Sequence, residues 1–214
     1  MIEVFALASL LSFVPFTGEA DVPCSDGPEQ RRAATLEELY EGGRSYTEFL
    51  REASRRADIW HGNTEKSDGI DAALVARARA VPGTWRFLAV AIDSCSDSVS
   101  TIPYLARLVS MVESLDMRIV DPTSGRAIME SHVTADGRAS TPTVLLLDDH
   151  FEEAGCFIER PPALKTWILE NELSREELYE RKMAWYADDS GQDTLEAFVT
   201  MLEAAARGSS VCQA

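Results

Sequence analysis

Residues 85–98 read Trp-Arg-Phe-Leu-Ala-Val-Ala-Ile-Asp-Ser-Cys-Ser-Asp-Ser, so an apolar run gives way to a polar one within a single stretch. The apolar part, 85–92, is nearly continuous, which is typical of a strand that is buried on both faces of a sheet. Beyond it, apolar side chains recur at helical spacing over 98–115. The stretch therefore predicts a buried strand that leads, through Cys95, directly into a long helix.

The segments that follow predict a small mixed sheet. A second strand is expected over 117–120 and a third over Thr143–Leu147, and a turn then leads into a fourth strand over roughly 154–158. Pro161 and Pro162 open a helix, at a position where helices accept proline. The order is β-α-β followed by β-β-α, which predicts an α/β fold with helices packed on a mixed sheet.

Further helices are expected on both sides of this core. One helix begins near Leu36, a second begins at Ser45 and continues to Trp60, and a third begins at Asp68. Ser45 and Glu48 form the pattern of a capping box, which marks a helix start. Two more helices fit the segments 174–187 and 192–207.

These elements divide the chain into four parts. The parts are a signal-like segment and linker over 1–34, helices over 35–83, the α/β core over 84–170 and C-terminal helices over 171–214. The apolar run 4–16 is too short to span a bilayer, and Glu3 has the wrong charge for a signal peptide, although residues 17–20 fit a cleavage site. The sequence alone leaves open a cytoplasmic or an exported, periplasmic location.

The net charge limits the classes of partner. The chain carries 20 Lys and Arg against 36 Asp and Glu, a net charge of −16. Such a surface repels phosphate backbones, so the sequence predicts no nucleic-acid partner. A small substrate, or a protein with a neutral or basic face, remains compatible with it.

The cysteines and histidines are widely spaced. They are Cys24, Cys95, Cys156, Cys212, His61, His132 and His150. Zinc sites usually draw their ligands from close-spaced pairs, so we expect no metal site and no cofactor. Cys156 is interpreted as a small buried apolar residue. Cys24 and Cys212 fall in segments expected to be flexible ends, from which either could reach another thiol if the protein is exported. The count alone fits two disulfides outside the cell or four thiols inside it.

Cys95 is the candidate nucleophile. At the start of a helix, free backbone N–H groups and the helix dipole favour a thiolate, although the like charges of Asp93 and Asp97 oppose it. Ser98 lies one helical turn on, where its hydroxyl can point at the sulfur. Pro103, eight residues after Cys95, is expected to bend the helix.

With these residues the sequence resembles the thioredoxin superfamily, over about residues 84–170. In that family a C-x-x-C or C-x-x-S motif opens a helix that a proline bends eight positions later, as Cys95 and Pro103 do here. Thr141-Pro142-Thr143 fits the family's cis-proline segment, and residues 75–86 resemble a bacterial subgroup. The resemblance implies a thioredoxin-like fold, a cis Thr141–Pro142 bond and a client-binding platform formed by Ser94, Thr141 and Pro142.

The motif departs from a dithiol thioredoxin, because Ser98 stands where the second cysteine would resolve a mixed disulfide. Ser94 likewise replaces the aromatic residue that commonly precedes the first cysteine. The predicted function is therefore monothiol exchange, or mixed-disulfide binding, with a protein client that carries a thiol or disulfide. In this interpretation Cys95 and Ser98 form the catalytic pair of a thiol-disulfide oxidoreductase. The alternative is a redox-inactive protein-binding module, and a glutathione-using enzyme ranks last because no basic cluster is evident for the carboxylates of glutathione.

Overall fold

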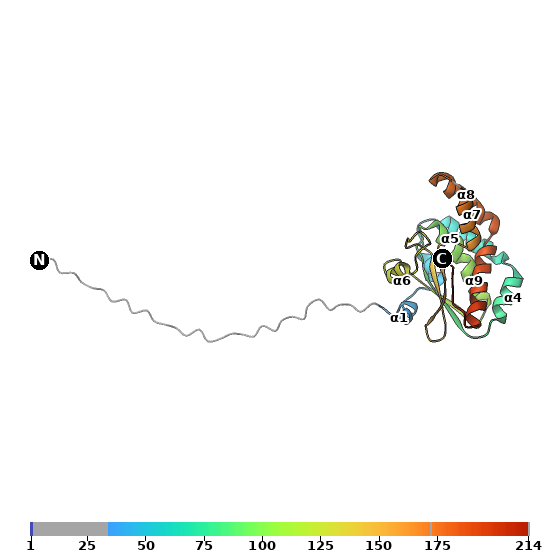
Figure 1. Cartoon of the computed structure of the whole chain (residues 1–214), viewed down its shortest axis with the longest axis horizontal. Coiled ribbons are helices and arrows are strands. Elements are labelled where there is room, and N and C mark those ends of the chain that lie inside the picture. Colours follow the sequence, from blue (N-terminus) through green and yellow to red (C-terminus); the bar gives the residue numbers. More distant parts are fainter. Residues whose placement is uncertain (2–33, 172, 214) are drawn as a thin grey trace. The chain divides into compact units, whose positions relative to one another are not determined.

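The structure, a computed structural model, describes residues 1, 34–171 and 173–213 (Figure 1). The signal-like segment, nearly all of the predicted linker and Cys24 therefore lie outside the described residues. The remaining elements belong to one compact unit, Ala33–Ala214. None of its described helices is both long and apolar enough to cross a membrane.

A five-stranded mixed sheet forms the centre of this unit, in the order β2-β1-β3-β4-β5. The strands are β1 (Trp85–Val90), β2 (Leu115–Val120), β3 (Thr143–Leu147), β4 (Glu153–Ile158) and β5 (Val211–Gln213). β1 runs parallel to β2 and antiparallel to β3, β3 is antiparallel to β4, and β4 is parallel to β5. The predicted α/β, thioredoxin-like class, with helices added on both sides, is confirmed.

Two predictions about cysteines at the sheet edge are wrong. The segment around Cys212 is the edge strand β5, and it pairs with β4. Cys156 is buried, as predicted, but it forms a disulfide with Cys212 and is not an unpaired apolar residue. Three residues show too little periodicity to reveal a strand, and the neighbouring strand supplies the pairing that orders them.

The described helices are α1 (Leu36–Glu41), α2 (Tyr46–Glu52), α3 (Ala57–Lys66), α4 (Ala72–Ala80), α5 (Ser96–Met111), α6 (Arg126–Ser131), α7 (Pro162–Glu170), α8 (Arg175–Asp189) and α9 (Gln192–Ala206). A single 3-10 turn, η1 (Ser67–Gly69), precedes α4. The capping box of Ser45 and Glu48 is present at the start of α2.

Two helix predictions need correction. The helix expected from Ser45 to Trp60 is broken, because Ala53 is extended and Arg56 takes a left-handed conformation with φ of 55°. The short helix α6 was not predicted. It begins at Gly125 without a side-chain cap, so it lacks the usual start signal.

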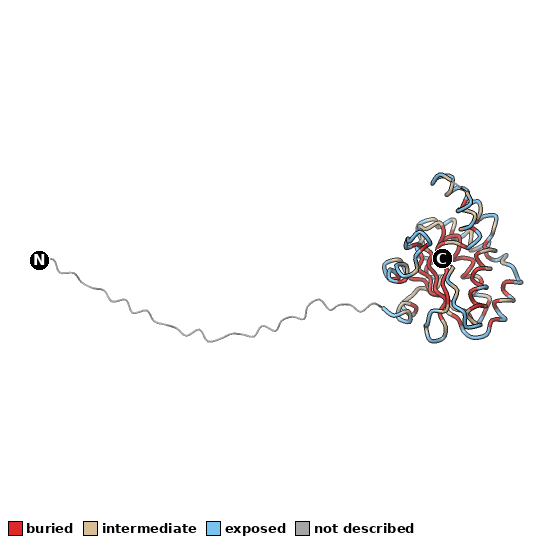
Figure 2. The backbone as a smooth tube through the Cα atoms, in the orientation of Figure 1, coloured by how far each residue is buried: buried red, intermediate tan, exposed pale blue. Residues whose placement is uncertain are grey.

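Each face of the sheet carries its own core, seen as buried strands flanked by partly exposed helices in Figure 2. On one face Phe87 and Phe157 pack with Phe198 of α9 and Trp60 of α3 in the larger cluster. On the other face the buried residues are Tyr40, Leu88, Val90, Val120, Ile128, Leu145, Leu147, Cys156 and Ile158. Because β1 is covered on both faces, its carboxyl end is a rigid base for the Cys95 segment.

Candidate functional site

Cys95 lies between two backbone groups at the start of α5. It is the N-cap residue of that helix, and the Ser98 N–H donates to its Sγ at 3.4 Å. The same Sγ donates to the Thr141 carbonyl oxygen at 3.1 Å. The thiol is half-buried, and it is the free cysteine within the described part of the chain. The structure thus brings together the motif and the Thr141 segment, 46 residues apart.

The segment that faces the thiol is held firmly. The Thr141–Pro142 peptide bond is cis in the structure. The Pro142 carbonyl accepts from the Glu159 N–H at 2.8 Å, and the Thr143 hydroxyl donates to the Ser140 carbonyl at 2.8 Å. Because Pro142 and Thr143 are buried, the Thr141 carbonyl is presented to Cys95 from a fixed backbone.

The expected contact between the Ser98 hydroxyl and the sulfur needs correction. The hydroxyl of Ser98 is buried and has no hydrogen-bond partner among the described residues. The backbone N–H of Ser98 contacts Cys95 instead, because the third residue of a helix has a free N–H for the N-cap side chain. Ser94 is exposed, and its carbonyl accepts from Arg56 Nε at 2.7 Å. Pro103 lies buried inside α5, eight residues beyond Cys95.

Asp93 ties the Cys95 segment to the N-terminal helices. Its carboxylate accepts from the backbone N–H groups of Ser54 and Arg55 at 2.9 and 2.8 Å, and its carbonyl accepts from Trp60 Nε1 at 3.0 Å. Partial burial raises the pKa of Asp93, but these N–H groups outweigh it and hold the pKa below its usual value. The segment between α2 and α3 is not helical, and its free N–H groups donate to this carboxylate instead.

Asp97 is buried, with 5% of its surface exposed, and its charge is compensated from three directions. Arg160 Nε donates to its carboxylate at 3.0 Å, Lys182 Nζ at 2.6 Å and the Tyr186 hydroxyl at 2.9 Å. Burial and the neighbouring Asp97 carboxylate raise the pKa of Tyr186 well above its usual value. The repulsion that Asp97 was expected to exert on a Cys95 thiolate is therefore offset by two adjacent cations.

Helix α8 thus reaches the Cys95 segment with several side chains. Lys182 is itself 5% exposed and also donates to Ser96 Oγ at 3.0 Å. Nearer the start of α8, the Tyr179 hydroxyl accepts from Arg56 at 2.8 Å. Lys182, Tyr186 and Arg160 were not predicted as site residues from the sequence. A Lys and a Tyr four residues apart share one helix face, a signal that would have marked a polar contact surface.

A pocket of about 360 Å³ opens beside this segment, at the carboxyl ends of β1 and β2. Its lining includes Arg44, Phe49, Ile92, Asp93 and Pro122. Open α/β sheets commonly bind ligands at this end of their strands, so the pocket lies at a position that such folds often use for binding.

A family model described as thioredoxin matches residues 43–178. The chain belongs to the thioredoxin family. The match begins before the predicted core and ends inside α8, so this family member shares with its relatives more than the 84–170 segment on which the resemblance was first seen. The curated proteins contain no match to it.

Two solved structures have a similar fold. One is a protein of unknown function, PA1234, from Pseudomonas aeruginosa, with 21% identity and a TM-score of 0.62 over 82% of this chain and 98% of that chain. The other is an HIV epitope-scaffold, with 20% identity and a TM-score of 0.64 over 82% and 99% of the two chains. At this identity the likeness shows the thioredoxin-like fold with its added helices.

Proposed function

We propose that this thioredoxin-family protein performs thiol-disulfide exchange as a monothiol, with Cys95 as the nucleophile. The observation that carries the proposal is the position of Cys95 Sγ, which accepts the Ser98 N–H at the start of α5 while half-exposed. Thiolates are the reactive form of cysteine, and donors at a helix start stabilise them. The cations on Asp97 add to this by removing a neighbouring negative charge.

The exchange step needs one sulfur from the protein. The Cys95 thiolate attacks one sulfur of a client disulfide, that S–S bond breaks, and the other client sulfur leaves as a thiolate that takes up a proton. A second thiol, from the client or from a small thiol compound, then attacks the mixed disulfide and releases Cys95. Ser98 does not take part in this second step, because a hydroxyl is too weak an acid to act as a resolving thiolate.

The client chain has a natural place beside the sulfur. Ser94 is exposed and precedes Cys95, and the Thr141 carbonyl contacts Sγ, so an extended chain bound across these residues would present its disulfide to Sγ. The pocket lined by Ile92 and Asp93 offers room for a neighbouring client side chain. The net charge of −16 favours clients with a neutral or basic surface.

A redox-inactive binding module is the second candidate. It is favoured by one observation, that the Cys95 thiol already donates a hydrogen bond to the Thr141 carbonyl within the protein. In that case the surface around Cys95 and Thr141 binds a partner without covalent chemistry.

Alkylation separates the two candidates. The folded protein is treated with iodoacetamide across a pH series and the modified cysteine is located by mass spectrometry, with Cys95→Ser and Cys24→Ser as matched variants. We expect labelling at Cys95 near neutral pH, retained in Cys24→Ser, and a mixed disulfide at Cys95 with cystamine. A Cys95 that stays unlabelled in the folded protein and forms no mixed disulfide would favour the binding module.

A further inference from the structure

The disulfide edge of the sheet holds a second group of reactive side chains, independent of Cys95. Cys156 of β4 and Cys212 of β5 lie directly opposite each other in the parallel pairing and form a disulfide with a Cα–Cα distance of 4.3 Å. Cys156 is fully buried, whereas Cys212 is exposed. The disulfide therefore connects a residue of the core to a residue on the protein surface.

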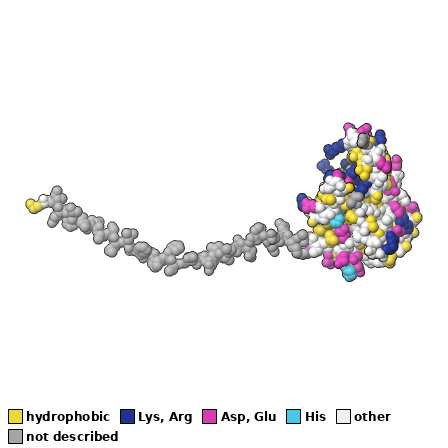
Figure 3. Space-filling view, in the orientation of Figure 1, with side chains coloured by type: hydrophobic (Ala, Val, Ile, Leu, Met, Phe, Trp, Pro, Cys, Tyr) yellow, Lys and Arg dark blue, Asp and Glu magenta, His cyan; other side chains and the backbone are white. Residues whose placement is uncertain are grey.

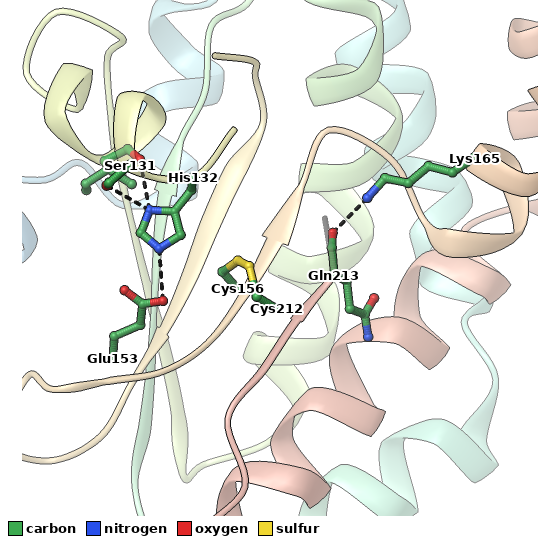
Figure 4. The surroundings of a disulfide bond; sticks show 8 residues. Ser131, His132, Glu153, Cys156, Lys165, Cys212 and Gln213 are labelled. Carbon is green, nitrogen blue, oxygen red and sulfur yellow. Dashed lines mark hydrogen bonds and ion pairs between the residues drawn. A yellow bond between two sulfur atoms is a disulfide. The ribbon is translucent and has the colours of Figure 1, made fainter. Parts of the chain in front are cut away.

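The side chains of His132 and Glu153 point toward each other beside the disulfide, as Figure 4 shows. His132 follows α6, and its Nε2 lies 2.9 Å from Glu153 Oε1. The ligand atoms of His132, Glu153 and Cys156 all lie within 4.8 Å of one another. Cys212 Sγ is bonded to Cys156 Sγ, so a fourth ligand atom is adjacent.

An irregularity in β4 places Glu153 on this face. Leu145 pairs with Cys156 and Leu147 pairs with Glu153, so β4 has one residue more than β3 between these pairs. Opposite residues of two paired strands share a face, and Leu145 and Leu147 belong to the same core cluster as Cys156. The extra residue, Ala154, thus turns the Glu153 side chain to the side of Cys156, which is a common use of a bulge.

The hydrogen bonds of His132 direct Nε2 toward the Glu153 carboxylate. Its Nδ1 lies 2.9 Å from the Ile128 carbonyl oxygen and 3.0 Å from the Ser131 hydroxyl. Because the carbonyl oxygen only accepts, a proton on Nδ1 is the tautomer that satisfies this contact. Nε2 and the Glu153 carboxylate are then two acceptors 2.9 Å apart, and a proton or a metal cation must lie between them. A histidine whose other nitrogen donates to a backbone carbonyl is the usual arrangement in zinc sites.

We propose that reduction of the Cys156–Cys212 disulfide creates a zinc site formed by Cys156, Cys212, His132 and Glu153. Two thiolates, one imidazole nitrogen and one carboxylate oxygen make a four-ligand set of the kinds that zinc binds. A dithiol reductant supplies two electrons and two protons, so the S–S bond breaks into two thiols. Zinc then displaces both thiol protons and any proton on His132 Nε2. In reverse, an oxidising disulfide takes up the two electrons, the S–S bond forms again and the zinc ion is released.

β5 keeps Cys212 in place after the disulfide breaks. Its backbone pairs with β4 on both sides of Cys212, and the Gln213 carbonyl accepts from Lys165 Nζ at 2.7 Å (Figure 4). The Gln213 side chain also donates to the Ala197 carbonyl of α9 at 3.1 Å. These bonds hold the two thiols opposite each other, so the reduced protein has the ligand group already assembled.

The site also has a path for the ion. Cys212 is exposed and a third of the Glu153 side chain is accessible, so an ion can enter from solvent along this edge. On the face that Figure 3 shows, acidic side chains are spread over the surface, in keeping with the net charge of −16, which attracts divalent cations.

Zinc binding is measured on the full chain, oxidised and dithiol-reduced, after removal of the reductant under anaerobic conditions. Competition with a chromogenic chelator gives the affinity, and Co²⁺ serves as a spectroscopic probe of thiolate ligands and tetrahedral geometry. We expect the reduced protein to bind one Zn²⁺ per chain with a thiolate-to-Co²⁺ charge-transfer band, and the oxidised protein to lack this site. His132→Gln, Glu153→Gln and Cys212→Ser are expected to weaken zinc binding at least about tenfold.

Matched controls keep the test specific. His150→Gln and Glu152→Gln alter exposed neighbours of the same residue types, and Cys95→Ser removes the other described thiol, so all three are expected to keep full zinc affinity. Circular dichroism verifies that each reduced variant is folded. The proposal is overturned if the folded, reduced protein binds no stoichiometric zinc, or if binding survives His132→Gln and Cys212→Ser unchanged.

Discussion

The two sulfur-containing regions of this molecule are built in opposite ways. At the Cys95 end, the order of residues along one strand and one helix places the thiol at the N-terminus of α5. At the Cys156–Cys212 edge, the reactive groups come from the end of α6, from β4 and from β5, and the disulfide alone spans 56 residues. A local motif can be predicted from the sequence, whereas a group of residues that meets across strands can be identified only in the folded sheet.

The largest expected effect is the loss of stability when the Cys156–Cys212 disulfide is removed. Cys212→Ser removes the disulfide and with it a constraint on the unfolded chain across 56 residues. For a loop of that length the loss in free energy of unfolding is about 4 kcal/mol. Urea unfolding under oxidising conditions measures it, and dithiol-treated wild type is expected to approach the same stability. Equal stability of the oxidised wild type and Cys212→Ser would contradict the prediction.

The next largest effect is a loss of stability in the Cys95 region when a buried charge next to Asp97 is removed. Lys182→Met leaves Asp97 with Arg160 and Tyr186 but without its shortest ionic partner. Removing one member of a buried ion pair typically costs about 3 kcal/mol, because the remaining charge stays out of water. Lys182→Arg is the conservative comparison, and Arg181→Met changes the exposed neighbour in α8. Urea unfolding should place Lys182→Met well below both.

A third prediction sharpens the contrast between a single and a paired thiol. Ser98→Cys should raise insulin reduction by about tenfold, which corresponds to roughly 1.4 kcal/mol in activation free energy. The Ser98 hydroxyl makes no hydrogen bond to any described residue, so the change removes no such interaction. Ser100→Cys, another buried serine in α5, is the control.

Two outcomes would count against it. If Ser98→Cys forms no internal disulfide with Cys95 and shows no added activity, the site lacks the geometry for exchange. If Ser100→Cys is equally active, the gain does not depend on the position one turn after Cys95.

The smallest effect is the pH dependence of the edge. The hydrogen bond to Glu153 raises the pKa of His132 above its usual value. A folded-state pKa above the unfolded one means that the stabilisation is full below pH about 6.5 and is lost as the pH rises through the folded-state pKa. For a partly exposed ion pair such as His132–Glu153, this stabilisation is about 0.5 kcal/mol. The difference in unfolding free energy between wild type and His132→Gln should shrink with rising pH, whereas His150→Gln should follow wild type at every pH.

The sequence by itself was enough for the elements whose signals are local. Neighbouring residues form the continuous apolar run of β1, the capping box at Ser45 and the periodicity of α5. The α/β class and the position of Cys95 could therefore be predicted from them. The resemblance to the thioredoxin superfamily rested on the same local motifs. Strand and helix starts are governed by nearest-neighbour chemistry, which is why such segments can be predicted.

Tertiary structure decided the remainder. Lys182 and Tyr186 contact Asp97 although they lie 85 and 89 residues away in the sequence. The residues near Asp97 give no sign of partners at that sequence separation. The break before Arg56 depends on Asp93, which takes up the free N–H groups of the broken segment. Cys156, Cys212, His132 and Glu153 meet because β5 pairs with β4 and a bulge turns one side chain over. Burial and strand pairing create these contacts, and both are properties of the folded chain as a whole.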